Sequence, residues 1–183
     1  ASSGTKADSY AADAITLLTA QAAAGLEPNV SVKLTALGLG EGEAVAASRL
    51  ERILETASSV RGFVRVDAEY PDSLDQLHRI VGAARDAGRP VGTVVQANMR
   101  RTSADVERLI AKGIPLRLVK GAYDPGVEGV GDADAVNAAY LSLAERLLVS
   151  EIPLAFGTHD DRIIRRLGET AKDRGEVQLL YGV

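Results

Sequence analysis

The sequence contains no cysteine, one methionine and no apolar run that approaches the ~18 residues of a membrane-spanning helix. The lack of cysteine excludes disulfide bonds and thiolate metal sites, and it fits a reducing compartment. The chain also lacks a basic excess, because 21 lysines and arginines stand against 25 acidic residues. A net charge of -4 argues against a protein that binds nucleic acid through phosphate contacts.

The composition is that of a globular protein, with 46% hydrophobic and 25% charged residues. Domains commonly hold about 100–200 residues, so a chain of this length has the size of one domain. We therefore expect residues 1–183 to form a single domain.

Short β-branched stretches alternate with longer stretches whose apolar residues have helical spacing. Glycines follow the helical stretches, as at Gly25, Gly88 and Gly113, which is typical of a left-handed C-terminal cap. Strands that alternate with helices predict a parallel sheet joined by crossover helices. The predicted strands are 29–34, 62–68, 90–97, 114–119, 152–158 and 176–182.

Two architectures fit this alternation. A (βα)8 barrel of about 250 residues spends roughly 31 residues on each unit, so six units need roughly 186 residues. The chain therefore has the length of six of the eight units. An open doubly wound sheet fits the same spacing equally well, and the periodicity alone does not decide between them.

Polar residues gather at the predicted carboxyl ends of five strands. In parallel α/β proteins this is the edge at which ligands bind, over the loops that leave the strands. The most prominent of these residues are Lys33, Asp67, Glu69, Gln96, Arg117, Lys120, Thr158, His159 and Asp160. Five strands in succession with such a residue predict a functional edge.

Several of these residues also have ordinary explanations when taken singly. Lys33 has the features of a surface lysine, and Asp67 serves equally well as a helix N-cap. Arg117 is the least ordinary, because it lies between two leucines and arginine is rarely buried without a partner. With two histidines in the chain, a histidine metal site around His159 has little support. The glycine-rich fingerprints of dinucleotide and nucleotide sites are absent.

Six segments resemble, in order and spacing, the catalytic domain of the proline dehydrogenase family. They are "SVKLTALG", "VRVDAE", "VVQANMRRT", "LRLVKGAY", "FGTHD" and "LLYGV". The resemblance implies a flavin-dependent (βα)8 barrel that oxidises L-proline to Δ1-pyrroline-5-carboxylate, with hydride passing from C5 of proline to N5 of FAD. We therefore expect an α/β fold of the (βα)8 TIM-barrel type, as an incomplete barrel with about six βα units.

The resemblance also implies roles for residues that match its motifs. Lys33 would lie near the flavin and the substrate carboxylate, and Asp67 would help to organise the substrate-binding arginines. Arg117 would lie near flavin N5, and Tyr123 would line the active site. The implied FAD contacts are Gln96, Arg117, Val119, Gly121, Thr158 and His159.

The chain departs from the family pattern at Asn98 and Met99, where the family usually has tyrosine and leucine. We recognise no motif of the family's first strand. We also recognise none of its last strand or last helix, where an arginine pair binds the substrate carboxylate. One alternative is a catalytically incomplete fragment or homologue that acts as a scaffold or needs another chain segment, and that self-associates through open barrel edges. Another is an unrelated barrel enzyme with Lys33 as a Schiff-base nucleophile.

The expected partners also follow from the resemblance. They are L-proline and an electron acceptor that is a quinone or another redox carrier, whereas the expectation of no nucleic acid comes from the net charge. The expected location is the cytoplasm, with a peripheral association with the inner membrane as a further expectation.

Overall fold

The computed structural model describes residues 3–182, without the side chains of Ser3, Glu169, Thr170 and Lys172. The chain divides into two compact units, which are described one at a time. Unit 1 consists of Ala1–Ala68 and Ser73–Thr93, and unit 2 of Glu69–Asp72 and Val94–Val183. Among the described residues, no helix is long and apolar enough to cross a membrane. The expectation of a single domain stays a prediction.

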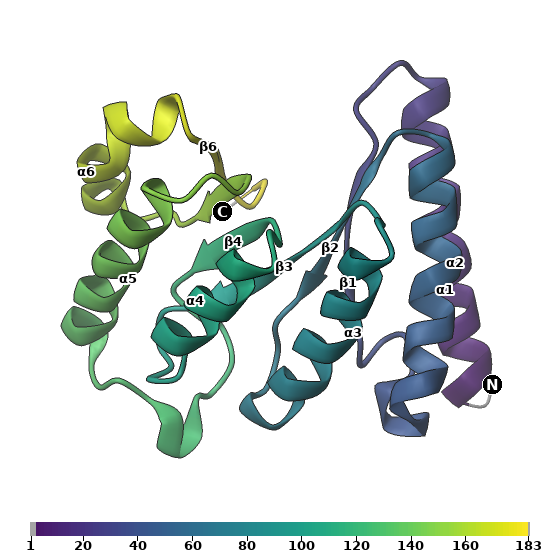
Figure 1. Cartoon of the computed structure of the whole chain (residues 1–183), viewed down its shortest axis with the longest axis horizontal. Helices are drawn as coiled ribbons and strands as arrows, with labels where there is room; N and C mark the ends of the chain where they lie inside the picture. Colours follow the sequence, from purple (N-terminus) through teal and green to yellow (C-terminus); the bar gives the residue numbers. More distant parts are fainter. Residues whose placement is uncertain (1–2, 183) are drawn as a thin grey trace. The chain divides into compact units, whose positions relative to one another are not determined.

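Unit 1 holds three helices and the first strands of the sheet (Figure 1). The helices are α1 (Ser3–Ala23), α2 (Glu43–Ser59) and α3 (Leu74–Asp86). The strands are β1 (Asn29–Lys33), β2 (Phe63–Asp67) and the start of β3 (Val91–Gln96). All pairings between these strands are parallel.

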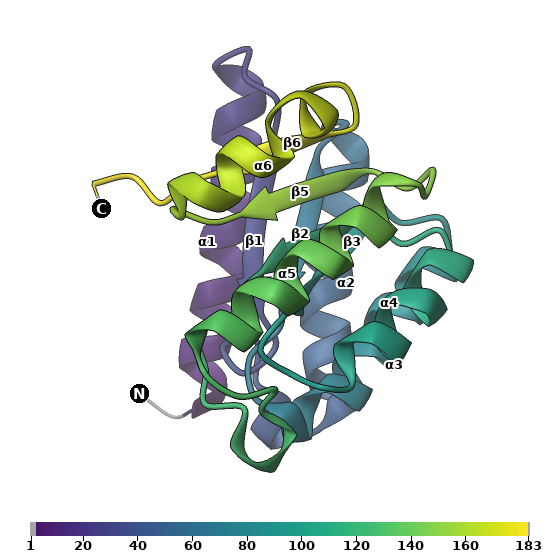
Figure 2. The ribbon, with the colours of Figure 1, turned by 90° about the vertical axis from the view of Figure 1, so that its left-hand side faces the viewer.

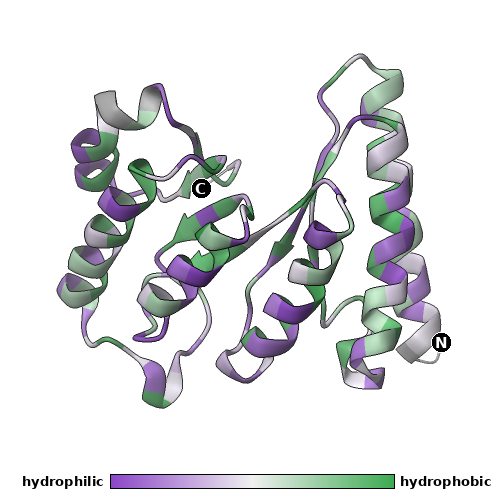
Figure 3. Cartoon of the chain, viewed as in Figure 1, coloured by the Kyte–Doolittle hydropathy of each residue, from purple (hydrophilic) through white to green (hydrophobic). Residues whose placement is uncertain are grey.

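The burial pattern of β1 follows from the alternation of its side chains. Val30 and Val32 are buried, whereas Asn29, Ser31 and Lys33 are exposed, because successive side chains of a strand point to opposite faces. The helix α1 packs against both β1 and α2 and covers apolar residues of the unit. Figure 3 shows hydrophilic and hydrophobic residues alternating along α2, as a helix with one buried face requires.

A buried arginine fixes the loop that follows β1. The Arg49 side chain donates to the Leu37 carbonyl at 3.1 Å and forms ion pairs with Asp8 and Glu41 at 2.9 and 3.0 Å. It also packs against Gly38, where a Cβ would lie 2.3 Å from the guanidinium. This cluster joins α1, α2 and the short 3-10 helix η1 (Leu39–Glu41), and so holds the loop that leaves Lys33.

Unit 2 contains the later βα units. It holds the end of β3, the strands β4 (Leu116–Val119), β5 (Leu154–Gly157) and β6 (Gly175–Gln178), and two 3-10 helices, η2 (Pro71–Ser73), which ends in unit 1, and η3 (Gly126–Glu128). The helices are α4 (Thr102–Ala111), α5 (Ala133–Leu148) and α6 (Asp161–Lys172). The strands β4, β5 and β6 pair in parallel.

The strand order decides between the two architectures that the spacing left open. The order is β1-β2-β3-β4-β5-β6, so each strand lies beside the next one in the sequence. A doubly wound sheet reverses its order at a switch point, whereas a barrel adds its strands in sequence. The α/β fold with six parallel strands, of the incomplete (βα)8 type, is therefore confirmed.

Two details of the sequence prediction are wrong. The helix α2 is followed not by a left-handed glycine but by Arg61, at φ 56°, and α5 ends at the C-cap Val149 with no glycine beside it. The glycine beside Arg61, Gly62, is needed for a close approach instead, because a Cβ there would lie 2.8 Å from the Pro28 carbonyl oxygen.

The strand predicted at 176–182 is β6, which begins one residue earlier and ends at Gln178. The residues after it run on beyond the end of β5 with exposed Leu179, Leu180 and Tyr181 (Figure 2).

Candidate active site

In unit 1, the carboxyl ends of β1 and β2 bring Lys33 and Asp67 together. The two residues are direct partners in the register of the parallel pair, as are Ser31 and Arg65 two positions earlier. The Lys33 side chain is exposed, and its backbone N–H donates to the Tyr10 hydroxyl at 3.3 Å. The predicted lysine and aspartate therefore share one edge of unit 1.

Arg65 on β2 was not predicted as a site residue. It is 6% exposed, and its guanidinium lies 5.2 Å from the centre of the Phe63 ring. Strand alternation places Phe63, Arg65 and Asp67 on one face, opposite the buried Val64 and Val66. The signal in the sequence was an arginine between two apolar residues, which are valines here and leucines at Arg117.

In unit 2, β4 separates apolar from polar side chains by alternation. Leu116 and Leu118 are fully buried and α5 packs against the strand. Arg117 and Val119 point to the other face, where they flank Gly157 of β5. The Arg117 Nη1 donates to the Gln178 side-chain oxygen at 3.1 Å.

Gln96 ends β3 and is 3% exposed. Its Nε2 donates to the Glu69 carbonyl at 3.0 Å, and its own backbone carbonyl accepts from the Thr102 hydroxyl at 2.5 Å. A buried amide needs specific partners, and these two contacts supply them for Gln96. The Glu69 carbonyl belongs to the last residue of the "VRVDAE" motif. Gln96 therefore fixes the segment that begins at Glu69, within unit 2.

The loop after β4 is pinned to the end of β3. The Ala97 and Asn98 N–H groups donate to the Val119 and Lys120 carbonyls, both at 2.8 Å. The Asn98 Nδ2 donates to the Tyr123 carbonyl at 3.2 Å. Gly121 has a φ of +117°, and a Cβ there would lie 2.3 Å from the Asn98 side chain. Glycine is therefore required here by the backbone and by the Asn98 amide.

Tyr123 meets a second tyrosine at this edge. Its ring centre lies 4.8 Å from that of Tyr70, with the ring planes at 67°. Tyr70 is 53% exposed, whereas Tyr123 is half-buried. The sequence did not predict Tyr70 as a residue of this site. It directly follows the "DAE" motif and is one of five tyrosines in the sequence.

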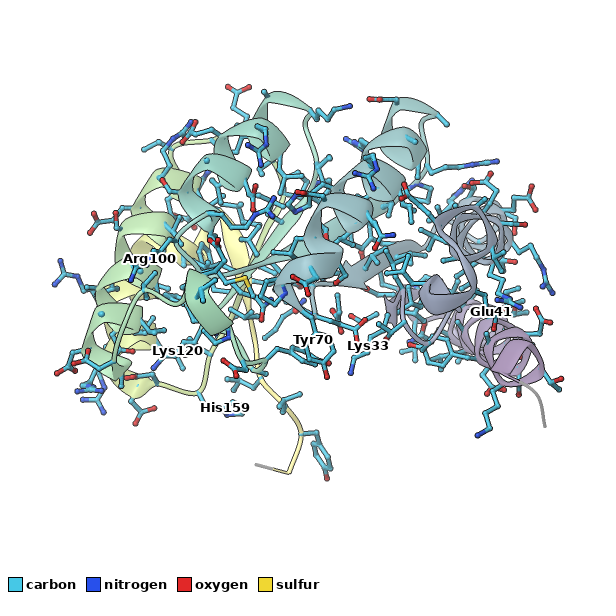
Figure 4. The ribbon with its side chains drawn as sticks, turned by 90° about the horizontal axis from the view of Figure 1, so that it is seen from below. Lys33, Glu41, Tyr70, Arg100, Lys120 and His159 are labelled. Carbon is cyan, nitrogen blue, oxygen red and sulfur yellow. The ribbon has the colours of Figure 1, made fainter. Side chains whose placement is uncertain are left out.

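The loops after β4 and β5 are joined by an ion pair. The Lys120 Nζ lies 2.8 Å from the Asp160 carboxylate, whose other oxygen caps α6 by accepting from the Arg162 N–H at 3.0 Å. Arg162 and Lys120 hold the pKa of Asp160 well below its usual value. Lys120 and His159 lie on the same side of unit 2 in Figure 4, at the carboxyl ends of β4 and β5.

The two predicted residues after β5 have different environments. Thr158 is 7% exposed, and its hydroxyl accepts from the Asp160 N–H at 3.1 Å. His159 is exposed, and its Nε2 accepts from the Leu180 N–H at 3.0 Å. No group of histidines and carboxylates suited to a metal occurs among the described residues.

Comparison with known sequences identifies the relatives of this chain. Residues 1–126 match the family model for proline dehydrogenase. The proline dehydrogenase of Deinococcus radiodurans is 32% identical over 192 aligned residues, covering 97% of this chain and 61% of that protein. Proline dehydrogenase 2 of Bacillus subtilis strain 168 is 31% identical over 165 residues, covering 86% and 54%. The chain thus spans little more than half the length of these relatives.

Solved structures show the same fold. Proline utilization A (PutA) from Bdellovibrio bacteriovorus, inactivated by N-propargylglycine, aligns with a TM-score of 0.84 at 23% identity, covering 98% of this chain and 24% of that one. A mutant PutA from Bradyrhizobium japonicum gives a TM-score of 0.86 at 22% identity, covering 98% and 23%. Residues 1–126, which are well over half of this chain, match the family model, so the chain belongs to the proline dehydrogenase family.

Proposed function

We propose that this chain belongs to the catalytic domain of a FAD-dependent proline dehydrogenase. The observation that carries the proposal is that the residues matching the family motifs lie at the carboxyl ends of successive parallel strands. In a (βα)8 fold this edge carries the active site. When bound, FAD would supply the chemistry by accepting hydride from C5 of L-proline at its N5, which yields Δ1-pyrroline-5-carboxylate.

The donor set of unit 2 fits a flavin. It offers a guanidinium at Arg117, an ammonium at Lys120 and a buried hydroxyl at Thr158. The Asn98 Oδ1 is buried and accepts no hydrogen bond from the described residues, so an acceptor is left for a donor from a ligand. Such a mixture of cationic and polar groups suits a ring system with both hydrogen-bond donors and acceptors.

The proposed FAD contacts are Gln96, Arg117, Val119, Gly121, Thr158 and His159. Among these, Arg117 holds a fixed positive charge at the strand face opposite the buried leucines. It would stabilise negative charge that develops on the bound cofactor, without reorganisation during the reaction. Lys120 adds a second cation after the same strand, in an ion pair with Asp160.

The proposed substrate contacts are Lys33 and Tyr123, with Asp67 in a supporting role. Lys33 ends β1 as an exposed cation, which suits the carboxylate of an imino acid. Tyr123 offers a half-buried ring that suits the saturated ring carbons. The electron acceptor (a quinone or another redox carrier), the cytoplasmic location, the peripheral membrane association and self-association through open barrel edges all stay predictions.

Titration of the purified protein with FAD tests the cofactor assignment. Flavin fluorescence should be quenched on binding, and Arg117→Met should weaken binding. Arg100→Met is a matched control, because Arg100 is exposed and its Nε donates to the Gly129 carbonyl at 2.8 Å. If the unsubstituted protein binds no FAD, the proposal fails and the non-catalytic homologue takes its place.

A further inference from the structure

Tyr123 is held by two side chains that the motif comparison gave no role. The Asn98 Nδ2 holds its backbone carbonyl at 3.2 Å, and the Tyr70 ring meets its ring at 4.8 Å. The two contacts act on different parts of Tyr123. Asn98 fixes where the backbone of the loop lies, whereas Tyr70 fixes how the ring is turned.

Tyr70 is itself well placed to orient another ring. The residue before it, Glu69, is anchored through its carbonyl by the buried Gln96 amide at 3.0 Å. The interplanar angle of 67° is that of an edge-to-face pair, a geometry that aromatic rings prefer because of their quadrupoles. An exposed tyrosine without such an anchor and geometry would be an ordinary surface residue.

We propose that Tyr70 is a positioning residue that sets the orientation of the Tyr123 ring, and through it the affinity of the site for proline. This inference rests on the proposed function, in which Tyr123 contacts the substrate. Because Asn98 holds the Tyr123 backbone separately, loss of the Tyr70 ring frees the Tyr123 ring and leaves the loop in place. Tyr70 takes no part in the chemical step.

Kinetic analysis of two variants tests the role in affinity. An edge-to-face pair contributes enough to change an equilibrium constant by about 2- to 10-fold. Tyr70→Ala should therefore raise the KM for L-proline by about 2- to 10-fold, with kcat changed less than about twofold. Tyr70→Phe keeps the ring and should retain the KM of the unsubstituted protein. A KM raised equally in both variants would assign the effect to the hydroxyl and overturn the inference.

Fluorine NMR tests the orientation without reference to activity. Replacing the five tyrosines by 3-fluorotyrosine gives one signal for each, and the Tyr123 signal is the one missing from Tyr123→Phe. Removing the neighbouring ring in Tyr70→Ala should shift this signal, whereas Tyr70→Phe should leave it close to its original position. Tyr181→Phe is the control, because Tyr181 is fully exposed and should leave the Tyr123 signal unmoved.

The two measurements separate the failure of the inference from that of the proposed function. If the unsubstituted protein oxidises proline but Tyr70→Ala changes neither KM nor the Tyr123 signal, the inference alone is wrong. If the unsubstituted protein does not oxidise proline, the role in affinity fails together with the proposed function. In that case the fluorine signal still decides whether Tyr70 orients Tyr123.

Discussion

Replacement of Gly121 by alanine should destabilise the loop that carries Tyr123. The φ of +117° at Gly121 lies in a region that side chains of L-residues rarely adopt. The new Cβ would also lie 2.3 Å from the Asn98 side chain, which must then move. Two separate costs, backbone strain and displacement of an amide, therefore act at one position.

The magnitudes of the two costs can be added. An alanine held in such a backbone conformation costs about 1–3 kcal/mol. Displacing the Asn98 amide loses its hydrogen bond to the Tyr123 carbonyl, which contributes about 1 kcal/mol. We therefore expect Gly121→Ala to lower the free energy of unfolding by about 2–4 kcal/mol.

Urea unfolding followed by far-UV circular dichroism measures this change. Gly113→Ala is the matched control, because Gly113 has a φ of +63° but no atom within 4 Å of its Cβ position, and should cost about 1–2 kcal/mol. In an Asn98→Ala background the cost of Gly121→Ala should fall by about 1 kcal/mol, because the obstructing amide is gone. Equal costs at the two glycines, with no change in that background, would refute the reasoning.

Three further predictions concern charge and packing. Arg117→Met should lower kcat/KM for L-proline by about 10²- to 10³-fold in a steady-state assay, because a fixed cation is lost from the site. The lowered pKa of Asp160 means that its ion pairs stabilise the fold above its ordinary pKa of 3.8 and are lost as the pH falls below it. Asp160→Asn keeps a capping side chain, so between about pH 2 and pH 5 its urea midpoint should depend less on pH than that of the unsubstituted protein. Gly62→Ala should lower the free energy of unfolding by about 1–3 kcal/mol in the same urea assay, because its Cβ would lie 2.8 Å from the Pro28 carbonyl oxygen.

The alternation of strands and helices could be predicted because it rests on local periodicity. The valines of β1 and the leucines of β4 stand at alternate positions, and the buried residues are the ones that alternation selects. The end of β6 could not be found in this way. Leu179 and Leu180 are as apolar as residues of a strand, yet they are exposed after β6 has ended at Gln178.

The site residues of the motifs could be placed on strand ends, but their partners could not. Gln96 was predicted at the end of a strand, whereas its acceptor, the Glu69 carbonyl, is a backbone group that carries no sequence signal. Tyr70 meets Tyr123 across 53 positions of sequence, and only the fold brings the two rings together. Gly121 was predicted as a FAD contact from the resemblance, whereas its close packing against Asn98 is seen only in the structure.

The central claim is that this chain forms the catalytic part of a FAD-dependent proline dehydrogenase. Its most direct test is the visible absorbance spectrum of the FAD-loaded protein, recorded without oxygen before and after addition of L-proline, with D-proline as the control. The account predicts that L-proline bleaches the flavin absorbance and that D-proline does not. A bound flavin that stays oxidised with L-proline would contradict the claim and favour a homologue that keeps the fold without the reaction.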